Sequence, residues 1–152
     1  MSILYIQIIG GFIIPWILGL WLIKDRIFLF AFYPAAVALA TTIDIIGSNY
    51  FWQFYPHANN KSFSSLPILT GIHPLSACFM LFLIYRKNIW PLPAICFFAG
   101  LLTLFEWLAQ QVGLLSYFNG WNIFWTFLSY FTPLAVLYLY SKQMKRHIKH
   151  PH

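Results

Sequence analysis

The chain has 152 residues, of which 61% are hydrophobic, 21% aromatic and only 8% charged, and its formal net charge is +6. Soluble domains carry about 25% charged residues, so this composition argues against a soluble globular domain and favours a chain whose apolar surface faces lipid. The basic residues lie between and after the apolar segments rather than on one phosphate-binding face, so we expect no nucleic-acid partner. Cys78 and Cys96 both lie in apolar segments and are interpreted as small hydrophobic residues, not as a disulfide or metal ligands.

Five segments are long enough to cross a bilayer, which takes about 20 mostly apolar residues. They cover residues 3–23, 27–48, 66–85, 89–112 and 121–141. The first has no basic residues before it and no small-residue cleavage site after it, so we interpret it as a retained span rather than a signal peptide. The sequence therefore predicts an all-α, polytopic transmembrane helix bundle in a single domain, residues 1–141, followed by a basic tail, residues 142–152.

The basic residues predict the orientation, because short loops rich in Lys and Arg stay on the cytoplasmic side. With the N-terminus outside, eight of the nine Lys and Arg residues lie inside and only Lys61 lies outside. We therefore expect a multi-pass protein of the cytoplasmic membrane with its C-terminus and its tail in the cytoplasm. Tryptophans near the ends of the spans are typical of a lipid-facing aromatic belt.

Only three acidic residues occur, and two of them, Asp44 and Glu106, lie inside predicted spans. A carboxylate in the hydrocarbon region costs roughly 2.5–3.5 kcal/mol on insertion scales, so such a residue is a functional-site hypothesis by default. Counting residues from the outer ends of their spans, at a rise of about 1.5 Å each, puts Asp44, Glu106 and His73 in the outer part of the bilayer, at similar depths.

Polar residues recur three or four positions apart in four of the spans, and residues at that spacing share one helical face. Such faces should turn inward, because lipid cannot satisfy their hydrogen bonds. The pattern predicts a pocket open to the outside whose polar residues are Asp44, His73, Glu106, Asn122, Thr103, Gln110 and Thr126. Two neighbouring carboxylates without a cation would share a proton, and such a site suits a cation, a proton or a basic head group.

A purely structural interpretation is the alternative for the same residues. Polar groups of this kind can hydrogen-bond between helices and hold the bundle together, at roughly 0.6–2 kcal/mol each. His73, beside Pro74, is also typical of a core histidine. The aromatic run 49–56 predicts an interfacial segment on the outer surface, with a cover over the pocket as the alternative. The tail histidines His147, His150 and His152 are interpreted as part of a solvated basic segment, so we expect no metal site.

Part of the chain resembles a known family. The segment around Asp44, "TTIDIIGSNYFW", the later Glu106 and the stretch "LLSYFNGWNIFWTFLSYF", with Trp121, Asn122 and Trp125, are similar to an uncharacterised family of small multi-spanning membrane proteins common in Gram-positive spore-forming bacteria. The resemblance covers roughly residues 30–140, and His73 has no counterpart in its pattern. It implies a membrane-spanning fold and implies no particular activity.

The sequence carries no Walker loop, dinucleotide fingerprint, zinc-protease motif or nucleophile elbow, and we expect no cofactor. The leading hypothesis is an integral membrane protein that binds or transports a small molecule, a cation or proton, or a lipid head group at an intramembrane polar site near the outer face. One alternative is an accessory or scaffolding subunit that docks a larger membrane partner or a second copy. The other is a lipid-modifying membrane enzyme with Asp44 or Glu106 as general acid or base.

Overall fold

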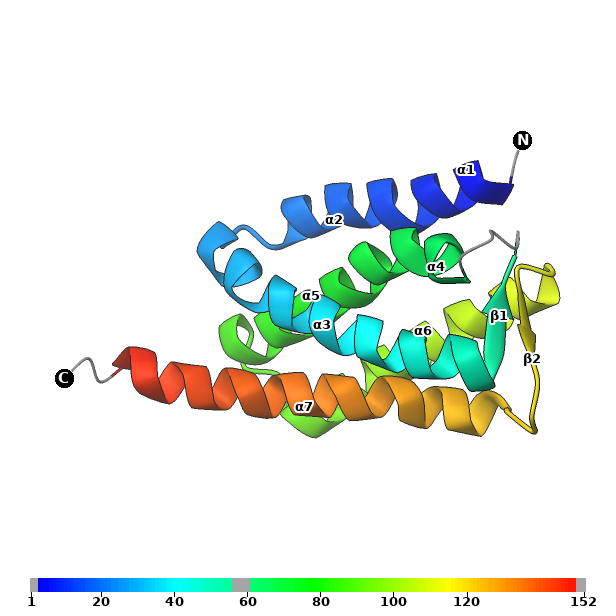
Figure 1. The fold of residues 1–152 in the computed structure, drawn as a ribbon. Coiled ribbons are helices and arrows are strands. Elements are labelled where there is room, and N and C mark those ends of the chain that lie inside the picture. Colours follow the sequence, from blue (N-terminus) through cyan, green and yellow to red (C-terminus); the bar gives the residue numbers. More distant parts are fainter. Residues whose placement is uncertain (1–2, 56–60, 150–152) are drawn as a thin grey trace.

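The computed structural model describes residues 3–55 and 61–149, and helices make up 82% of it (Figure 1). Five helical segments in the described part are long and apolar enough to span a membrane, as the sequence predicts. They are Tyr5–Leu22, Arg26–Tyr50, Ser64–Arg86, Pro91–Gln111 and Ile123–Met144. Each end lies within a few residues of the predicted one, because hydropathy along the chain already marks where an apolar helix must stop.

The five segments divide into seven α-helices and one π-helical stretch. The first comprises α1 (Ile3–Gln7), the π-helix η1 (Ile8–Ile13) and α2 (Ile14–Leu22); the second is α3 (Arg26–Tyr50); the third comprises α4 (Lys61–Thr70) and α5 (Ile72–Arg86); the last two are α6 (Pro91–Gln111) and α7 (Ile123–Lys149). The helix starts follow ordinary capping rules: Asp25 accepts a bond from the Phe28 N–H at 3.0 Å, and Pro91 occupies the first turn of α6. The basic segment predicted after the fifth span thus begins as the last turns of α7.

The third span is broken between α4 and α5 at Gly71. A Cβ at Gly71 would lie 1.9 Å from the Gly11 carbonyl oxygen of η1, so only glycine allows the first span to cross this closely. Pro74 has no N–H to donate to the Thr70 carbonyl oxygen, four positions earlier, which instead accepts bonds from the Trp16 indole at 3.1 Å and the Tyr33 hydroxyl at 2.6 Å. These two donors satisfy a backbone group that lipid would leave unpaired.

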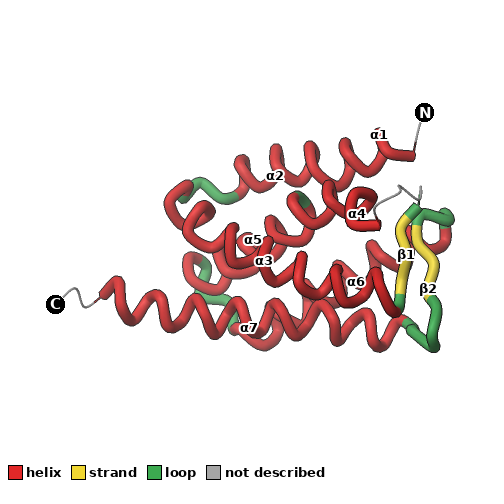
Figure 2. Tube along the Cα trace, in the orientation of Figure 1, coloured by secondary structure: helices red, strands yellow, loops and turns green. Residues whose placement is uncertain are grey.

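A two-stranded sheet is the departure from a purely helical fold. Strand β1 (Trp52–Phe54) pairs antiparallel with β2 (Leu115–Tyr117), and Figure 2 shows the pair at the end of the bundle away from the C-terminus. The sequence predicts an interfacial segment at residues 49–56 and a linker between the fourth and fifth spans at residues 116–120, because three-residue strands leave no periodic pattern. In the structure the strands satisfy each other's backbone groups and pack the buried side chains of Trp52, Phe54 and Leu115 against the helices.

The two ends of the bundle differ in chemistry. The turns between α2 and α3 and between α5 and α6, with the C-terminal part of α7, lie at one end, and the sheet lies at the other (Figure 1). We call the first the basic end, because it carries Lys24, Arg26, Arg86, Lys87 and Lys142, and the second the sheet end. An apolar core between them includes the fully buried Leu29, Met80, Leu81 and Leu137.

Candidate functional site

A small cavity lies between the helices beneath β1. Residues of α3, β1, α4, α5, α6 and α7 line it, and its polar lining residues are Asp44, Trp52, His73, Glu106, Ser129 and Tyr130. The space open to the centre of a water molecule is about 50 Å³. A buried water needs about 10–15 Å³ of such space, so the cavity has room for a few waters or one small ion. It is well below the roughly 300 Å³ at which pockets for drug-sized ligands begin.

Asp44 is buried and accepts hydrogen bonds from two neutral donors. The Ser65 hydroxyl donates to Oδ2 at 2.8 Å and the Trp52 indole to Oδ1 at 3.3 Å. Gly47, one turn further along α3, makes room for this indole, because a Cβ there would lie 1.8 Å from the Trp52 ring. The sequence therefore folds a bulky aromatic side chain back over the helix that carries the carboxylate.

Glu106 is surrounded by hydroxyl groups. The Tyr117 hydroxyl donates to Oε1 at 2.6 Å, the Tyr130 hydroxyl donates to Oε2, and the Thr126 hydroxyl lies 3.3 Å from Oε1. The Trp121 indole in turn donates to the Thr126 hydroxyl at 2.9 Å. Burial and the adjacent Glu106 carboxylate raise the pKa of Tyr117 above its usual value, so this phenol stays a neutral donor.

His73 extends the Glu106 network into the cavity. Its Nε2 lies 3.3 Å from the Tyr130 hydroxyl oxygen, and the two rings meet edge to face with centroids 5.1 Å apart. A phenol has one proton, so when Tyr130 donates to Glu106, His73 must donate from Nε2 to Tyr130. When Tyr130 instead donates to His73, Glu106 must carry the proton that it shares with Tyr130. The three side chains therefore form a chain with two proton arrangements.

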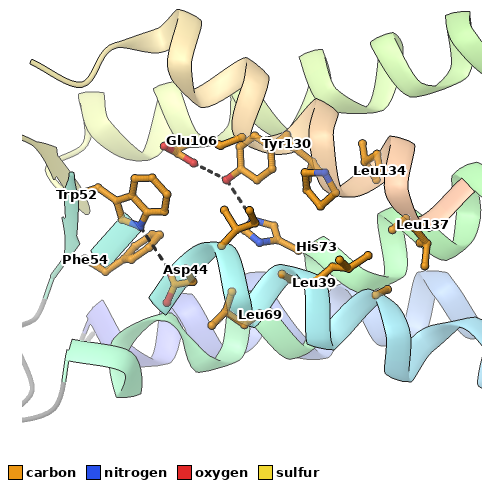
Figure 3. A pocket seen from close by; sticks show the side chains of 17 residues that line it. Leu39, Asp44, Trp52, Phe54, Leu69, His73, Glu106, Tyr130, Leu134 and Leu137 are labelled. Carbon is orange, nitrogen blue, oxygen red and sulfur yellow. Dashed lines mark hydrogen bonds between the residues drawn. The ribbon is translucent and has the colours of Figure 1, made fainter. Parts of the chain in front are cut away.

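The sheet joins the two carboxylates. Trp52 on β1 and Tyr117 on β2 are direct partners in the strand register, so their side chains leave the sheet on the same face. One donates to Asp44 and the other to Glu106. Figure 3 shows Asp44 beside Trp52 on one side of the cavity and Glu106 beside Tyr130 on the other, with His73 between the helices that carry them.

The structure brings together only part of the predicted residue set. Asp44, His73 and Glu106 line one cavity, and Thr126 contacts Glu106 from α7. Their role in ligand binding stays a prediction.

Three of the predicted residues lie elsewhere. Asn122 is exposed and caps α7, where its side-chain oxygen accepts from the Phe124 N–H at 3.0 Å and the Trp125 N–H at 3.4 Å. Thr103 donates to the Ala99 carbonyl of its own helix at 2.7 Å. Gln110 lies a turn beyond Glu106 and is not among the residues that line the cavity.

Four donors to the site were not predicted: Trp52, Ser65, Tyr117 and Tyr130. A signal existed for Tyr130, which follows Thr126 by four positions and therefore shares its face of α7. The sequence predicts Trp52 as an interfacial aromatic and places Tyr117 in a linker, and only the strand pairing reveals their contacts. The side chains of His147, His150 and His152 lie outside the described residues.

Among the described residues, the two carboxylates of the cavity differ from the third acid, Asp25, in whether a cationic side chain pairs with them. The one ion pair in this part of the chain joins Asp25 to Arg86 at the basic end. No group of three or more His, Cys, Asp and Glu residues that could hold a metal is found among the described side chains. Asp44 and Glu106 are thus held by hydroxyl and indole donors.

Comparison of the sequence with protein-family models and with curated proteins, and of the structure with solved structures, gives no match. The family resemblance drawn on residues 30–140 therefore stays a prediction.

Proposed function

We propose that the protein binds a proton reversibly at Glu106, inside the membrane, and that a small cationic group can take the place of that proton. The observation that carries the proposal is the pair Asp44 and Glu106 on one small cavity, where the donors to their oxygens among the described residues are all neutral. A carboxylate that is removed from water without a cation is costly, and a bound proton or cation removes that penalty.

His73 and Tyr130 provide the route for the proton. A proton that reaches Nδ1 of His73 from the cavity lets Nε2 pass its own proton to Tyr130, and Tyr130 passes its proton to Glu106. One proton enters at His73 and one proton arrives at Glu106. In the process His73 changes from its Nε2–H to its Nδ1–H tautomer, and Tyr130 remains a phenol. The 3.3 Å separation of Tyr130 and His73 and the bond between Tyr130 and Glu106 support this path.

The proposal includes an orientation. Most basic residues lie at one end of the bundle, and in membrane proteins such loops face the cytoplasm. The sheet end, with its cavity, then faces the outside. Two exposed glutamines allow a matched test, Gln111 at the sheet end and Gln143 at the basic end. In intact cells Gln111→Cys should react with an impermeant thiol reagent and Gln143→Cys should not, in a Cys96→Ala background; the opposite labelling would reverse the orientation.

The binding of the proton is tested by infrared spectroscopy of the protein in lipid nanodiscs. A pH titration should show a protonated carboxyl band that is lost in Glu106→Gln. Asp44→Asn should keep this band but shift its midpoint, because the second carboxylate lines the same cavity. A carboxyl band that is identical in wild type and Glu106→Gln would contradict the proposal.

A further inference from the structure

A second hollow also borders the Glu106 network. It is bounded by η1, α4, α5 and α6, and about 170 Å³ of it is open to the centre of a water molecule. We call it the lateral crevice. Its walls include Phe54, His73, Leu102, Glu106 and Tyr130, which also line the small cavity. Glu106, His73 and Tyr130 therefore line both spaces.

The crevice opens towards lipid beside the first span. In Figure 1 this span lies along the side of the bundle, with α1 next to α4 at the sheet end. The rim residues Ile6, Gly10 and Phe105 are exposed, and the remaining lining is largely aliphatic and aromatic. Gly10 lines the crevice, and a Cβ there would meet no atom within 4 Å, so a larger side chain has room at this position. Gly10 lies in the π-helix η1, a geometry often found at functional sites.

Gln7, which lines the lateral crevice, contributes a side-chain oxygen that can accept a hydrogen bond. Gln7 is only 5% exposed, its Nε2 donates to the Tyr55 carbonyl at 2.7 Å, and its Oε1 has no hydrogen-bond partner among the described residues. Because the Tyr55 carbonyl requires the NH₂ group, the oxygen must be the unpaired end of the amide. A buried acceptor without a donor is destabilising, so the binding of a molecule that donates a hydrogen bond to this oxygen is favoured.

We propose that the lateral crevice binds an amphiphile with a primary ammonium head group and a single apolar chain. This inference rests on the proposed function, because it gives the Glu106 carboxylate its cationic ligand. The ammonium supplies hydrogen-bond donors to Glu106 and Gln7, which a quaternary ammonium lacks, and the apolar chain lies along Ile6, Ile68 and Phe105 towards the lipid. When the ammonium pairs with Glu106, the proton held there leaves through Tyr130 and His73, so one proton is released for each ligand bound.

The test uses octylammonium as the probe, titrated calorimetrically into the protein in phosphatidylcholine nanodiscs. Runs in two buffers of different ionisation enthalpy measure the protons released. We expect saturable binding to the wild type with about one proton released near neutral pH. Octyltrimethylammonium and octanol should each bind at least about tenfold more weakly, because one lacks the donors and the other the charge.

Two leucine substitutions provide matched variants. Gly10→Leu fills the crevice and should weaken octylammonium binding at least about tenfold. Gly100→Leu on α6 is the control, because a Cβ there also meets no atom within 4 Å and Gly100 does not line the crevice. Gln7→Leu should weaken binding several-fold while leaving the infrared band of Glu106 in place.

Equal binding to wild type, Gly10→Leu and Gly100→Leu would overturn the inference, since that is the result expected for partition into lipid alone. Octanol binding as tightly as octylammonium, without proton release, would also overturn it. In both cases a normal carboxyl titration of Glu106 would leave the proposed function standing, whereas loss of that titration in the wild type would remove the proposed function itself.

Discussion

The acidic residues at the two ends of the bundle are held in opposite ways. At the basic end, Asp25 caps α3 and pairs with Arg86, and the side chains of Asp25 and Arg86 are 28% and 57% exposed. At the sheet end, Asp44 is buried and Glu106 is half-buried, and hydroxyl and indole groups donate to them. An acid with a cationic partner needs no further explanation, whereas a buried and a half-buried acid whose partners among the described residues are all neutral indicate a site. The difference separates an acid that serves the fold from two that we assign to function.

The largest expected effect is at Gly47, where a side chain would break the sheet end. In Gly47→Ala the new Cβ would lie 1.8 Å from the Trp52 ring, so the ring must leave and Asp44 loses a donor. Overpacking and a lost buried hydrogen bond together should lower the free energy of unfolding by about 3 kcal/mol or more. Denaturant unfolding in detergent measures this. Gly100→Ala is the control and should be neutral or slightly stabilising; an equally mild effect at Gly47 would show that Trp52 is not held against α3.

A second comparison uses the same substitution at both ends. Tyr130→Phe removes a donor from Glu106 and should cost about 1–2 kcal/mol of unfolding free energy and break the path between His73 and Glu106. Tyr85→Phe removes the bond to Ser141 near the basic end, which is 2.7 Å long, and should cost about 0.5–1.5 kcal/mol without affecting the carboxyl titration. The account fails if the two variants have the same effect on the infrared band of Glu106.

The smallest effect is expected at Asp25. The Phe28 N–H and then Arg86 lower the pKa of this carboxyl below its usual value of 3.8. A lowered pKa in the folded state means that the stabilisation is present above the unfolded value and is lost as the pH falls through the folded one. Asp25→Asn should therefore be slightly less stable than wild type at pH 7 and at pH 5. The difference should shrink as the pH falls below 3.8 and vanish once the pH is below the lowered pKa of the folded state. Thermal unfolding measured from pH 7 downwards checks this, and a difference that stays constant in acid would contradict it.

The local part of the structure was predictable from the sequence, and the pairing of distant segments was not. Hydropathy marks the five apolar helices, and helical spacing puts Asp44 and Glu106 on inward faces. The meeting of Trp52 and Tyr117 depends on strands of three residues from distant parts of the chain, which no periodicity announces. Asn122 illustrates a different error, because an Asn just before an apolar run is also an N-cap signal, and capping is the role it has.

The central claim is that Glu106 takes up a proton through Tyr130 and His73, and the tautomer of His73 tests it most directly. Nitrogen-15 NMR of the histidine side chains, assigned with His73→Asn, would follow the ring while the infrared band of Glu106 is titrated in the same nanodiscs. We expect His73 to carry its proton on Nε2 when Glu106 is ionised and on Nδ1 when Glu106 is protonated. In wild type the His73 tautomer and the Glu106 band should change with the same midpoint, and in Tyr130→Phe the two changes should no longer share a midpoint. A His73 tautomer that stays constant while Glu106 titrates would contradict it.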